Sequence, residues 1–433
     1  MKLGVVSLGC DKATVDSERL VGELVGHGAV VTPDLPTADV ILVNTCGFID
    51  AAKRESIEAI LEAVKLKAGG VKAVVAVGCL VERYAAELTA ELPEVDLLLG
   101  FSELHRLVPE LSRRGLLEDP VARHPGVRHF LGSGSHVRYL KISEGCDHTC
   151  AFCAIPLMRG RHRSEPLERL VREAQQLEAA GAREINLVAQ DIGHYGRDLR
   201  GPTLPTLLEA LLRETGVAWY RLLYMYSAGL TEPLVELVAR EPRVVPYLDI
   251  PIQHASDRML ERMRRPERQA SLREKLRWLR AAIPDLALRT TCLVGFPGET
   301  DQDFRELLEF LEEARFDRLG AFAYSPQEGT RAVLYADDVP DGVKGERLEE
   351  LLEVQRAISA DRLSRFVGRE TPVLVDRVAE SDEGATHVGR VQWQADDVDG
   401  VTYVQATGAS PGAFVRARVT HCEDYDFRAE ALV

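Results

Sequence analysis

The sequence predicts an α/β protein built from three successive parts. Over residues 1 to about 100, short apolar runs alternate with amphipathic helical patterns, and the same alternation resumes at residue 137. After about residue 365 the pattern changes to short β-rich runs separated by Gly, Asp and Ser. We therefore expect an N-terminal α/β domain with a parallel sheet, a central partial (β/α)6 barrel and a small C-terminal antiparallel β-barrel.

The N-terminal part contains four short apolar runs with helical patterns between them. The helical stretches include DSERLVGELVGHG and ERYAAELTAEL, in which apolar residues recur at helical spacing. Buried parallel strands read as continuous apolar runs rather than as alternating ones. The predicted strands are therefore residues 2–8, 39–44, 73–78 and 95–100.

The central part repeats this arrangement with six apolar runs, which are residues 137–142, 184–189, 219–224, 247–252, 286–294 and 318–324. Six strands in about 190 residues suit an open or partial barrel, because a full eight-unit barrel needs about 250 residues. A charged helical stretch over 345–368 precedes the C-terminal β-rich part. The predicted boundaries are a first domain over 1–110, a linker over 111–134, a central domain over 135–365 and a barrel over 366–433.

Composition bounds the class of protein. The chain has 433 residues, a formal net charge of −15 and eight cysteines. This acidity argues against broad, non-specific binding to nucleic acid or anionic lipid, and it is compatible with a basic partner. No apolar run approaches the roughly 18 residues that span a bilayer, and the N-terminal apolar stretch is too short for a secretory signal. We expect a cytoplasmic protein with no membrane partner, whose clustered cysteines are metal ligands or catalytic groups rather than disulfides.

Three cysteines stand close together in SEGCDHTCAFCAIP, residues 143–156. Cys146, Cys150 and Cys153 follow the first predicted strand of the central barrel, so they should lie at its C-terminal face, where barrel enzymes carry out chemistry. Structural zinc prefers four protein ligands, whereas three thiolates can hold three irons of a 4Fe-4S cluster and leave the fourth iron open. We favour the cluster. A zinc or purely structural site is the competing interpretation, and His148 is at most an alternative ligand.

Three further cysteines lie far apart in the first part of the chain. Each of these cysteines stands one residue after an apolar run: Cys10 after VVSL, Cys46 after ILVN and Cys79 after VVAV. Because the carboxyl ends of adjacent parallel strands converge on one crevice, three such thiols can meet at one point. Glycine beside each cysteine lets the backbone turn sharply next to a bulky cluster. We predict a second three-thiol 4Fe-4S site; three unrelated buried cysteines are the alternative.

The C-x3-C-x2-C spacing, with Phe152 before the last cysteine, resembles the radical S-adenosylmethionine (SAM) enzymes. The resemblance implies that the open iron binds the amino and carboxylate groups of SAM. It also implies that the reduced cluster cleaves SAM to methionine and a 5′-deoxyadenosyl radical, while the protein positions the cofactor. Cys146, Cys150 and Cys153 would then be catalytic, and Phe152 would belong to the cofactor site.

The order of the three parts resembles the methylthiotransferases over essentially the whole chain, and the C-terminal part looks like their TRAM domain. The resemblance implies two 4Fe-4S clusters and SAM as cofactors. The central cluster would make a radical that removes hydrogen from an unactivated substrate carbon. The cluster of the first part would bind a sulfur species, which receives a methyl group from a second SAM and then joins that carbon. An external sulfur donor and a reductant would be required.

Two branches of that family compete. One modifies an adenosine in transfer RNA (MiaB-type), and the other modifies the β-carbon of an aspartate in small-subunit ribosomal protein twelve (RimO-type). Lys12 follows the first cysteine with no Gln–Met pair, and Leu–Met precedes Arg159, where the transfer-RNA branch typically has Tyr–Thr. Gln253-His254 stand where that branch typically has Gln–Ser–Gly, and QDIGHYG resembles a loop of the second branch. These stretches favour the ribosomal protein, although Ala13 stands where the family often has Asn.

The charge of the C-terminal part agrees with this choice. Residues 366–433 contain six Arg, no Lys and twelve Asp plus Glu, a net charge of −6. A barrel that binds RNA should present a basic surface, because phosphate contacts dominate affinity, whereas an acidic barrel attracts an Arg- and Lys-rich protein. We expect a basic ribosomal small-subunit protein as the substrate. Transfer RNA as substrate, a merely soluble acidic surface and a non-catalytic zinc scaffold are the alternatives.

Polar residues also end two of the central strands. Gln190 and Asp191 end the second strand, and Gln253 and His254 end the fourth, so we expect them at the active-site rim. Gln190 and Gln253 are candidate contacts to SAM or the substrate, with a solvated rim as the alternative.

Three remaining features are weaker. The stretch VGFPGETDQDF lacks the lysine of a P-loop, so we predict a turn that opens a helix with Thr300 as N-cap and Asp303 at the third position. The basic runs MRGRHR (158–163) and RMRRPER (262–268) are solvated faces by default, with SAM or ribosomal RNA as alternative contacts. Cys292 and Cys422 fit neither cysteine set, and we predict packing or structural roles for them.

Overall fold

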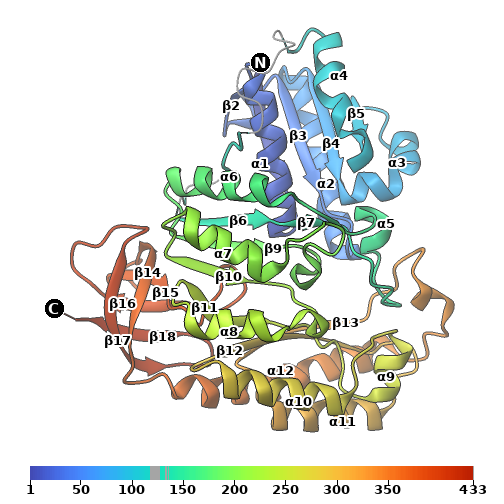
Figure 1. Cartoon of the computed structure of the whole chain (residues 1–433). Coiled ribbons are helices and arrows are strands. Elements are labelled where there is room, and N and C mark those ends of the chain that lie inside the picture. Colours follow the sequence, from blue (N-terminus) through green and yellow to red (C-terminus); the bar gives the residue numbers. More distant parts are fainter. Residues whose placement is uncertain (118–126, 132–133, 135, 433) are drawn as a thin grey trace. The chain divides into compact units, whose positions relative to one another are not determined.

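The computed structural model describes residues 1–117, 127–131, 134 and 136–432, and these fall into two compact units (Figure 1). Unit 1 comprises Met1–Ser133 with Gly145–Asp147 and Ala154–Arg161, and unit 2 comprises Gly134–Glu144, His148–Cys153 and His162–Val433. Part of the predicted linker over 111–134 lies outside the described residues, and the predicted domain boundaries stay predictions. Among the described helices, none combines the length and the apolar character needed to cross a membrane.

Unit 1 is built on a parallel sheet whose strands run in the order β2-β1-β3-β4-β5. Every residue of β3 and β4 is buried, because helices cover the sheet and leave no polar face for alternation. The strands are β1 (Lys2–Ser7), β2 (Val30–Val31), β3 (Val40–Thr45), β4 (Ala73–Gly78) and β5 (Leu97–Leu99), and the helices are α1 (Asp11–Gly26), α2 (Asp50–Lys65), α3 (Cys79–Glu91) and α4 (Leu107–Arg113). The four predicted strands are thus confirmed, and the carboxyl ends of β1, β3 and β4 are neighbours.

Unit 2 contains the six parallel strands of the predicted partial barrel, which lie side by side in chain order in one sheet (Figure 1). The strands are β6 (Val137–Lys141), β9 (Glu184–Val188), β10 (Trp219–Leu222), β11 (Val244–Asp249), β12 (Ala287–Val294) and β13 (Arg318–Ala323). The helices of this part are α6 (Leu167–Ala179), α7 (Leu204–Glu214), α8 (Glu232–Arg240), α9 (Asp257–Arg262), α10 (Gln269–Ala282), α11 (Asp301–Ala314) and α12 (Asp341–Ser364).

The predicted start of helix α11 is confirmed. The Thr300 hydroxyl accepts a hydrogen bond from the Asp303 amide at 3.3 Å, and the Asp303 carboxylate accepts one from the Thr300 amide at 2.9 Å. This reciprocal pair satisfies two amides that the helix itself leaves without a partner. The glycine-rich stretch before it is therefore a helix-opening turn.

Short elements around the central cysteines escaped the sequence analysis. Strands β7 (Ser143–Glu144) and β8 (Arg163–Ser164) form a two-residue antiparallel pair, and α5 (Ile155–Arg159) is a helix of five residues. Elements this short carry no periodic signal, so hydrophobic patterning does not detect them.

The C-terminal part is a closed five-stranded barrel in the order β14-β15-β16-β18-β17. Four of its pairings are antiparallel, and β16 pairs with β18 in parallel. Its strands are β14 (Glu370–Val378), β15 (His387–Arg390), β16 (Thr402–Gln405), β17 (Phe414–Cys422) and β18 (Phe427–Ala431). Closure leaves no strand edge exposed, which is how a small barrel avoids edge-to-edge association.

The barrel packs against the amino ends of the central strands. Trp219, which begins β10, meets Phe414 of the barrel with ring centroids 4.9 Å apart. Glu184, which begins β9, lies fully buried between Arg221 at 2.6 Å and Arg390 of β15 at 2.7 Å. Burial alone would raise the pKa of Glu184, but the two guanidinium groups outweigh it and hold that pKa below its usual value. The carboxylate is therefore ionised and joins the two parts of unit 2.

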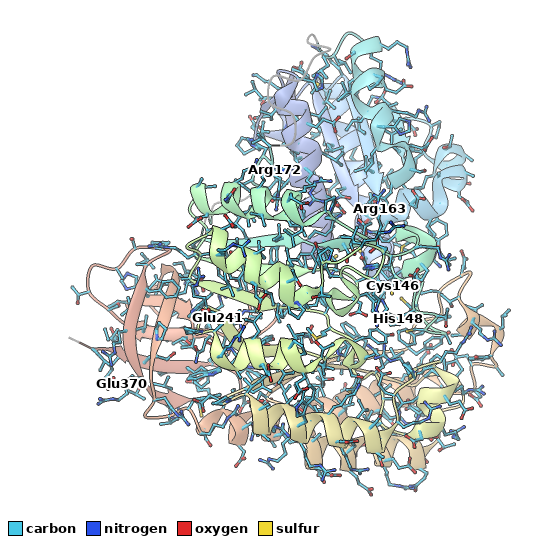
Figure 2. The ribbon with its side chains drawn as sticks, in the orientation of Figure 1. Cys146, His148, Arg163, Arg172, Glu241 and Glu370 are labelled. Atoms are coloured by element: carbon cyan, nitrogen blue, oxygen red, sulfur yellow. The ribbon has the colours of Figure 1, made fainter. Side chains whose placement is uncertain are left out.

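Replacing Glu184→Gln should destabilise unit 2 by about 3–5 kcal/mol, because it leaves two buried guanidinium groups without their counter-charge. Urea denaturation followed by circular dichroism measures this. Glu370→Gln is a matched control, since Glu370 also bonds two arginines, Arg416 and Arg418, but on the surface of the barrel (Figure 2). The unfolding midpoint of that variant should stay close to wild type, and equal losses in both variants would contradict the role of burial.

Candidate functional site

Unit 1 brings the three scattered cysteines together. Cys10 precedes α1 just after β1, Cys46 follows β3, and Cys79 begins α3 directly after β4. Gly9 has φ +99°, and a Cβ placed there would lie 3.4 Å from the Cys46 Sγ. A Cβ placed at Gly47 would lie 3.1 Å from the backbone of Cys79. Glycine is therefore required beside these thiols, both for backbone conformation and for space.

Hydrogen bonds fix the backbone that carries these thiols. The Cys46 amide donates to the Ser56 hydroxyl of α2 at 2.9 Å, and that hydroxyl donates back to the Cys46 carbonyl at 3.0 Å. The buried Asn44 side chain donates to the Ala13 carbonyl at 2.9 Å and to the Ser17 hydroxyl at 2.8 Å, which ties α1 to the end of β3. The site is thus held by its own sheet and helices.

The charges of these three cysteine thiols would be stabilised by a bound cation. Burial raises the pKa of the Cys79 thiol to about 11, and it also raises the pKa of Cys46. The charges of the neighbouring cysteines act in the same direction. Three adjacent thiolates are therefore unfavourable on their own, and a bound metal or iron–sulfur cluster removes this cost because its positive charge favours deprotonated ligands. The donor set suits a thiolate-bound iron–sulfur cluster.

The central cysteines lie on one loop that passes through both units. Cys146 belongs to unit 1, where its amide donates to the Gly160 carbonyl at 3.0 Å. Cys150 and Cys153 belong to unit 2, where the Cys153 amide donates to the Cys150 carbonyl at 3.2 Å. The Ala151 amide donates to the Met263 carbonyl at 2.9 Å, which anchors the second half of the loop after α9.

A buried tyrosine that the sequence analysis missed contacts one of these thiols. The Tyr226 hydroxyl lies 2.5 Å from the Cys150 Sγ, and the imidazole of His148 stacks on the tyrosine ring with centroids 3.6 Å apart. Burial raises the pKa of Tyr226 far above its usual value, so the phenol keeps its proton. Tyr226 follows β10, and a tyrosine after a predicted strand was the only signal available in the sequence.

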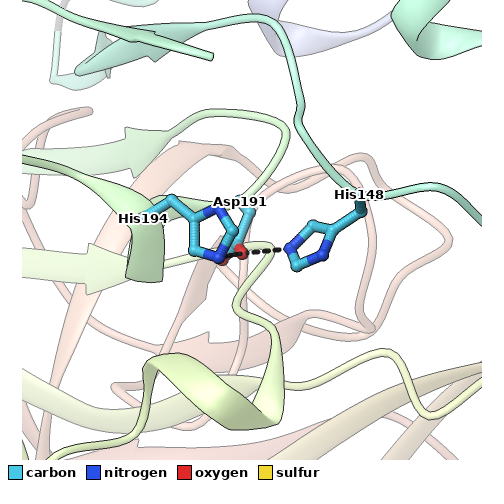
Figure 3. Close-up of side chains that lie close together, drawn as sticks. All are labelled: His148, Asp191 and His194. Atoms are coloured by element: carbon cyan, nitrogen blue, oxygen red, sulfur yellow. Dashed lines mark hydrogen bonds and ion pairs between the residues drawn. The ribbon is translucent and has the colours of Figure 1, made fainter. Parts of the chain in front are cut away.

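His148, Asp191 and His194 form a compact group in which Asp191 and His194 are buried and His148 is half-buried (Figure 3). Asp191 Oδ2 lies 2.7 Å from His148 Nε2 and 3.4 Å from His194 Nε2. Asp191 Oδ1 accepts hydrogen bonds from the Gly193 amide at 3.0 Å and from the Tyr226 amide at 3.1 Å. One carboxylate therefore orients His148, Tyr226 and the loop after β9.

This group is a hydrogen-bond network rather than a metal site. Two ligands of a tetrahedral zinc ion lie about 3.3 Å apart, whereas 2.7 Å between Asp191 and His148 is the length of a direct charge-assisted hydrogen bond. Burial also lowers the pKa of His194 to about 4, so its ring is neutral near pH 7. Burial would raise the pKa of Asp191, but hydrogen bonding from His148 and the neighbouring charges hold it below its usual value.

The candidate cofactor contacts lie at the carboxyl ends of the strands. Gln190 donates to Glu144 at 3.1 Å, and Gln253 adopts φ +68° while its amide donates to the Thr291 carbonyl at 2.8 Å. Phe152 meets Phe296 edge-on, with ring centroids 6.5 Å apart. Positive φ in a non-glycine residue is unfavourable and clusters at functional sites. Direct contact of these side chains with SAM stays a prediction.

Two other expectations have clear outcomes. His254 does not face a rim; it is fully buried, and its Nδ1 accepts from the Ala255 and Ser256 amides at 2.9 Å each. Cys292 is fully buried in β12, and Cys422 of β17 is half-buried with its thiol 3.9 Å from the Ala360 carbonyl.

Replacing Asp191→Ala should lower the stability of unit 2 by about 3 kcal/mol, because His148 and two backbone amides lose a charged acceptor. Thermal or urea unfolding at pH 7 measures the loss. Asp147→Ala is the control from the same loop, since Asp147 is half exposed and lies 3.6 Å from the exposed Arg161, and it should change stability by less than about 1 kcal/mol. A negligible loss in the Asp191 variant would contradict its anchoring role.

Comparison with known protein families assigns each part of the chain. Residues 2–100 match the uncharacterized protein family UPF0004, residues 140–311 match the radical SAM superfamily, and residues 367–432 match the TRAM domain. Membership of the radical SAM superfamily implies SAM and a 4Fe-4S cluster. The closed five-stranded barrel is thus the TRAM domain, and the six-stranded sheet is the radical SAM domain.

Solved structures with a similar fold share little sequence with this chain. The radical SAM methyltransferase TsrM from Kitasatospora setae matches with a TM-score of 0.55 and 13% identity, over 74% of each chain. The cobalamin-dependent SAM radical enzyme OxsB matches with a TM-score of 0.52 and 13% identity, over 81% of this chain and 56% of that one. These matches support the fold alone.

Curated relatives match over nearly the full length. Proteins named ribosomal protein uS12 methylthiotransferase RimO are 44% identical in Geobacter sulfurreducens (100% of this chain, 98% of the relative) and 48% identical in Desulforudis audaxviator (100% and 97%). The relative from Aquifex aeolicus is 44% identical over 98% of this chain and 96% of its own length. With this identity and coverage, and with all three family models in the same order, the chain belongs to the RimO family of ribosomal protein uS12 methylthiotransferases.

Proposed function

We propose that this chain is a radical SAM enzyme with two 4Fe-4S clusters that adds a methylthio group to the β-carbon of an aspartate in ribosomal protein uS12. The observation that carries the proposal is the convergence of Cys10, Cys46 and Cys79 in a chain that has a separate C-x3-C-x2-C loop. Relatives named for this reaction cover the whole chain. One three-thiol site serves radical chemistry, and the second provides a place to hold sulfur.

Cys146, Cys150 and Cys153 would hold the first cluster. With SAM bound, that cluster supplies a radical that can remove hydrogen from an unactivated carbon, a bond that ordinary acid–base groups do not break near neutral pH. The chain's own part is positioning. The Tyr226 hydroxyl keeps its proton and would donate to the Cys150 sulfur when that sulfur is a cluster ligand, while Asp191 and His148 hold the tyrosine in place. Tyr226 and Asp191 are buried, whereas His148 and Cys150 are half-buried, so this sulfur is partly shielded from water.

Cys10, Cys46 and Cys79 would hold the second cluster. Three protein thiolates leave one iron of a 4Fe-4S cluster open, and that iron supplies a binding position for an anionic sulfur species. The fixed glycine turns and the hydrogen bond between Cys46 and Ser56 keep the thiols in place before any cluster binds. An external sulfur donor and a reductant are required, because these residues supply neither.

The charge of the barrel favours a protein substrate over transfer RNA. All six of its arginines form ion pairs with carboxylates: Arg369 with Asp285, Arg377 with Glu383, Arg390 with Glu184, Arg416 and Arg418 with Glu370, and Arg428 with Glu423. RNA binding relies on arginine and lysine contacts to phosphate. The acidic residues between them suit a basic ribosomal protein.

The barrel and the Cys150 sulfur lie at opposite ends of the central strands. Glu184 at the amino end of β9 bonds the barrel, whereas Asp191 beyond its carboxyl end bonds the cysteine loop. At about 3.3 Å per residue, this separation is roughly 20 Å. A substrate that touches both ends must therefore be a macromolecule or an extended segment of one.

Anaerobically reconstituted protein should carry about eight irons per chain, four for each cluster. The triple variant Cys10→Ala/Cys46→Ala/Cys79→Ala should retain about four irons and still cleave SAM to 5′-deoxyadenosine, yet transfer no methylthio group. Iron and acid-labile sulfide assays with chromatography of the nucleoside measure these outcomes. Stoichiometric zinc in place of iron would support a scaffold instead.

Incubation with SAM, sulfide and a reductant should add a methylthio group to uS12 and leave transfer RNA unmodified. Mass spectrometry of the digested protein and of the digested RNA reports both products in one experiment. Cys150→Ala is the negative control for both substrates. A methylthio gain on transfer RNA alone would overturn the proposed substrate.

A further inference from the structure

Each of the two basic runs of the sequence contains one arginine whose side chain is buried. In the run 158–163, the Arg159 side chain is 3% exposed, whereas Arg161 is 96% exposed. In the run 262–268, the Arg265 side chain is 2% exposed, whereas Arg264 is exposed. Burying a guanidinium group costs several kcal/mol unless it is paired. Both buried arginines lie beside a cysteine, one in each three-thiol set.

Arg159 lies beside Cys79 in unit 1. Helix α5, which carries Arg159, packs on Cys79 through Ala154 and Met158. Asp16 of α1 accepts a hydrogen bond from Arg159 Nη1 at 2.5 Å, and the guanidinium lies 4.1 Å above the Phe101 ring. The Arg159 guanidinium is also a hydrogen-bonding and charged neighbour of the Cys79 thiol. A buried cation therefore lies next to this cysteine.

Arg265 lies beside Cys150 in unit 2. Its Nη1 is 3.9 Å from the Cys150 Sγ, and its guanidinium lies 3.7 Å from the centre of the Tyr226 ring. Nη2 donates to the Pro251 carbonyl at 2.8 Å, and Glu267 holds Nε at 3.2 Å. These contacts fix the planar guanidinium group of Arg265, so that its Nε lies toward the Glu267 carboxylate and its Nη1 lies toward the Cys150 sulfur.

The two arrangements share one electrostatic design. In each, a buried carboxylate pairs with the guanidinium, and the same guanidinium neighbours a cysteine: Cys150 for Arg265 and Cys79 for Arg159. A positive group at a ligand sulfur stabilises the added electron of a reduced iron–sulfur cluster, because hydrogen bonds and charge at the sulfurs set its potential. The Arg265 guanidinium lies about 4 Å from the Cys150 sulfur, and a charge interaction at this distance is much stronger in a low-dielectric protein interior than in water.

We propose that each cysteine set has its own buried arginine, Arg159 at Cys79 and Arg265 at Cys150, which raises the reduction potential of the cluster held there. The inference rests on the proposed function, since it requires a cluster at each set. Arg159 and Arg265 are positioning residues in this scheme. Arg159 is assigned to the N-terminal cluster because it neighbours Cys79, and Arg265 to the central cluster because it neighbours Cys150.

The test measures each cluster alone. In the background Cys146→Ala/Cys150→Ala/Cys153→Ala, only the N-terminal cluster forms, and in the background Cys10→Ala/Cys46→Ala/Cys79→Ala, only the central one forms. Redox titration followed by electron paramagnetic resonance gives the midpoint potential of each. Arg159→Met should shift the N-terminal cluster to a more negative potential, and Arg265→Met should shift the central cluster in the same direction.

Matched controls remove the same charge from the same runs without touching a sulfur. Arg161→Met and Arg264→Met, at the exposed positions, should leave both potentials at the wild-type value. Arg159→Lys and Arg265→Lys keep the charge but lose the planar fork, so their potentials should lie between those of wild type and the methionine variants. These lysine variants also serve if a methionine variant fails to fold.

The outcomes separate the inference from the function on which it rests. If the single-cluster backgrounds bind no iron, the proposed pair of clusters is wrong. If each background binds about four irons and the buried-arginine variants keep wild-type potentials, the two-cluster proposal stands and the role of the arginines is wrong. Equal shifts in buried and exposed variants would also overturn it, because the effect would then come from net charge alone.

Discussion

The structure depends on one electrostatic constraint, which is the gathering of several thiolates in places that are partly closed to water. Burial raises the pKa of Cys46 and Cys79, and the charge of Cys10 opposes the ionisation of both. A fold that brings such groups together needs a rigid backbone to prevent their separation and a cation to balance their charge. The backbone is held by the glycine turns beside Cys10 and Cys79 and by the hydrogen bonds between Cys46 and Ser56. Arg159 places a positive charge nearby.

Parallel sheets provide the rigid backbone in both units. All strands of such a sheet end at one edge, so residues distant in sequence arrive side by side without special loops. Unit 1 uses this edge for Cys10, Cys46 and Cys79, and unit 2 uses the corresponding edge for Asp191 and Tyr226. The opposite edge of the unit 2 sheet is available for a different task. There, Glu184 with its two arginines and the rings of Trp219 and Phe414 attach the barrel.

The predictable part of the site follows from residue type and spacing. Apolar runs located the strands within one to three residues, and the cysteines after them predicted two three-thiol sets. Tyr226, His194 and Glu184 were not predicted, because a tyrosine, a histidine or a glutamate has no special meaning in a sequence until its neighbours are known. His254 shows the reverse case: it was predicted to end the fourth central strand at the rim, yet it lies beyond the end of β11, is fully buried and caps its own backbone.

The two basic runs illustrate what the sequence alone does not determine, which is the arginine of each run that is buried. MRGRHR and RMRRPER contain several arginines of identical chemistry, and nothing local distinguishes Arg159 from Arg161 or Arg265 from Arg264. The sequence alone determined the order of the three parts, the strands and the six candidate ligands, because hydrophobic period and cysteine placement are properties of the chain. Only the tertiary structure decided which arginine faces a sulfur and which carboxylate orients a histidine. Those choices depend on which side chains helix and strand packing buries together, and that packing joins residues from 43 to 143 positions apart.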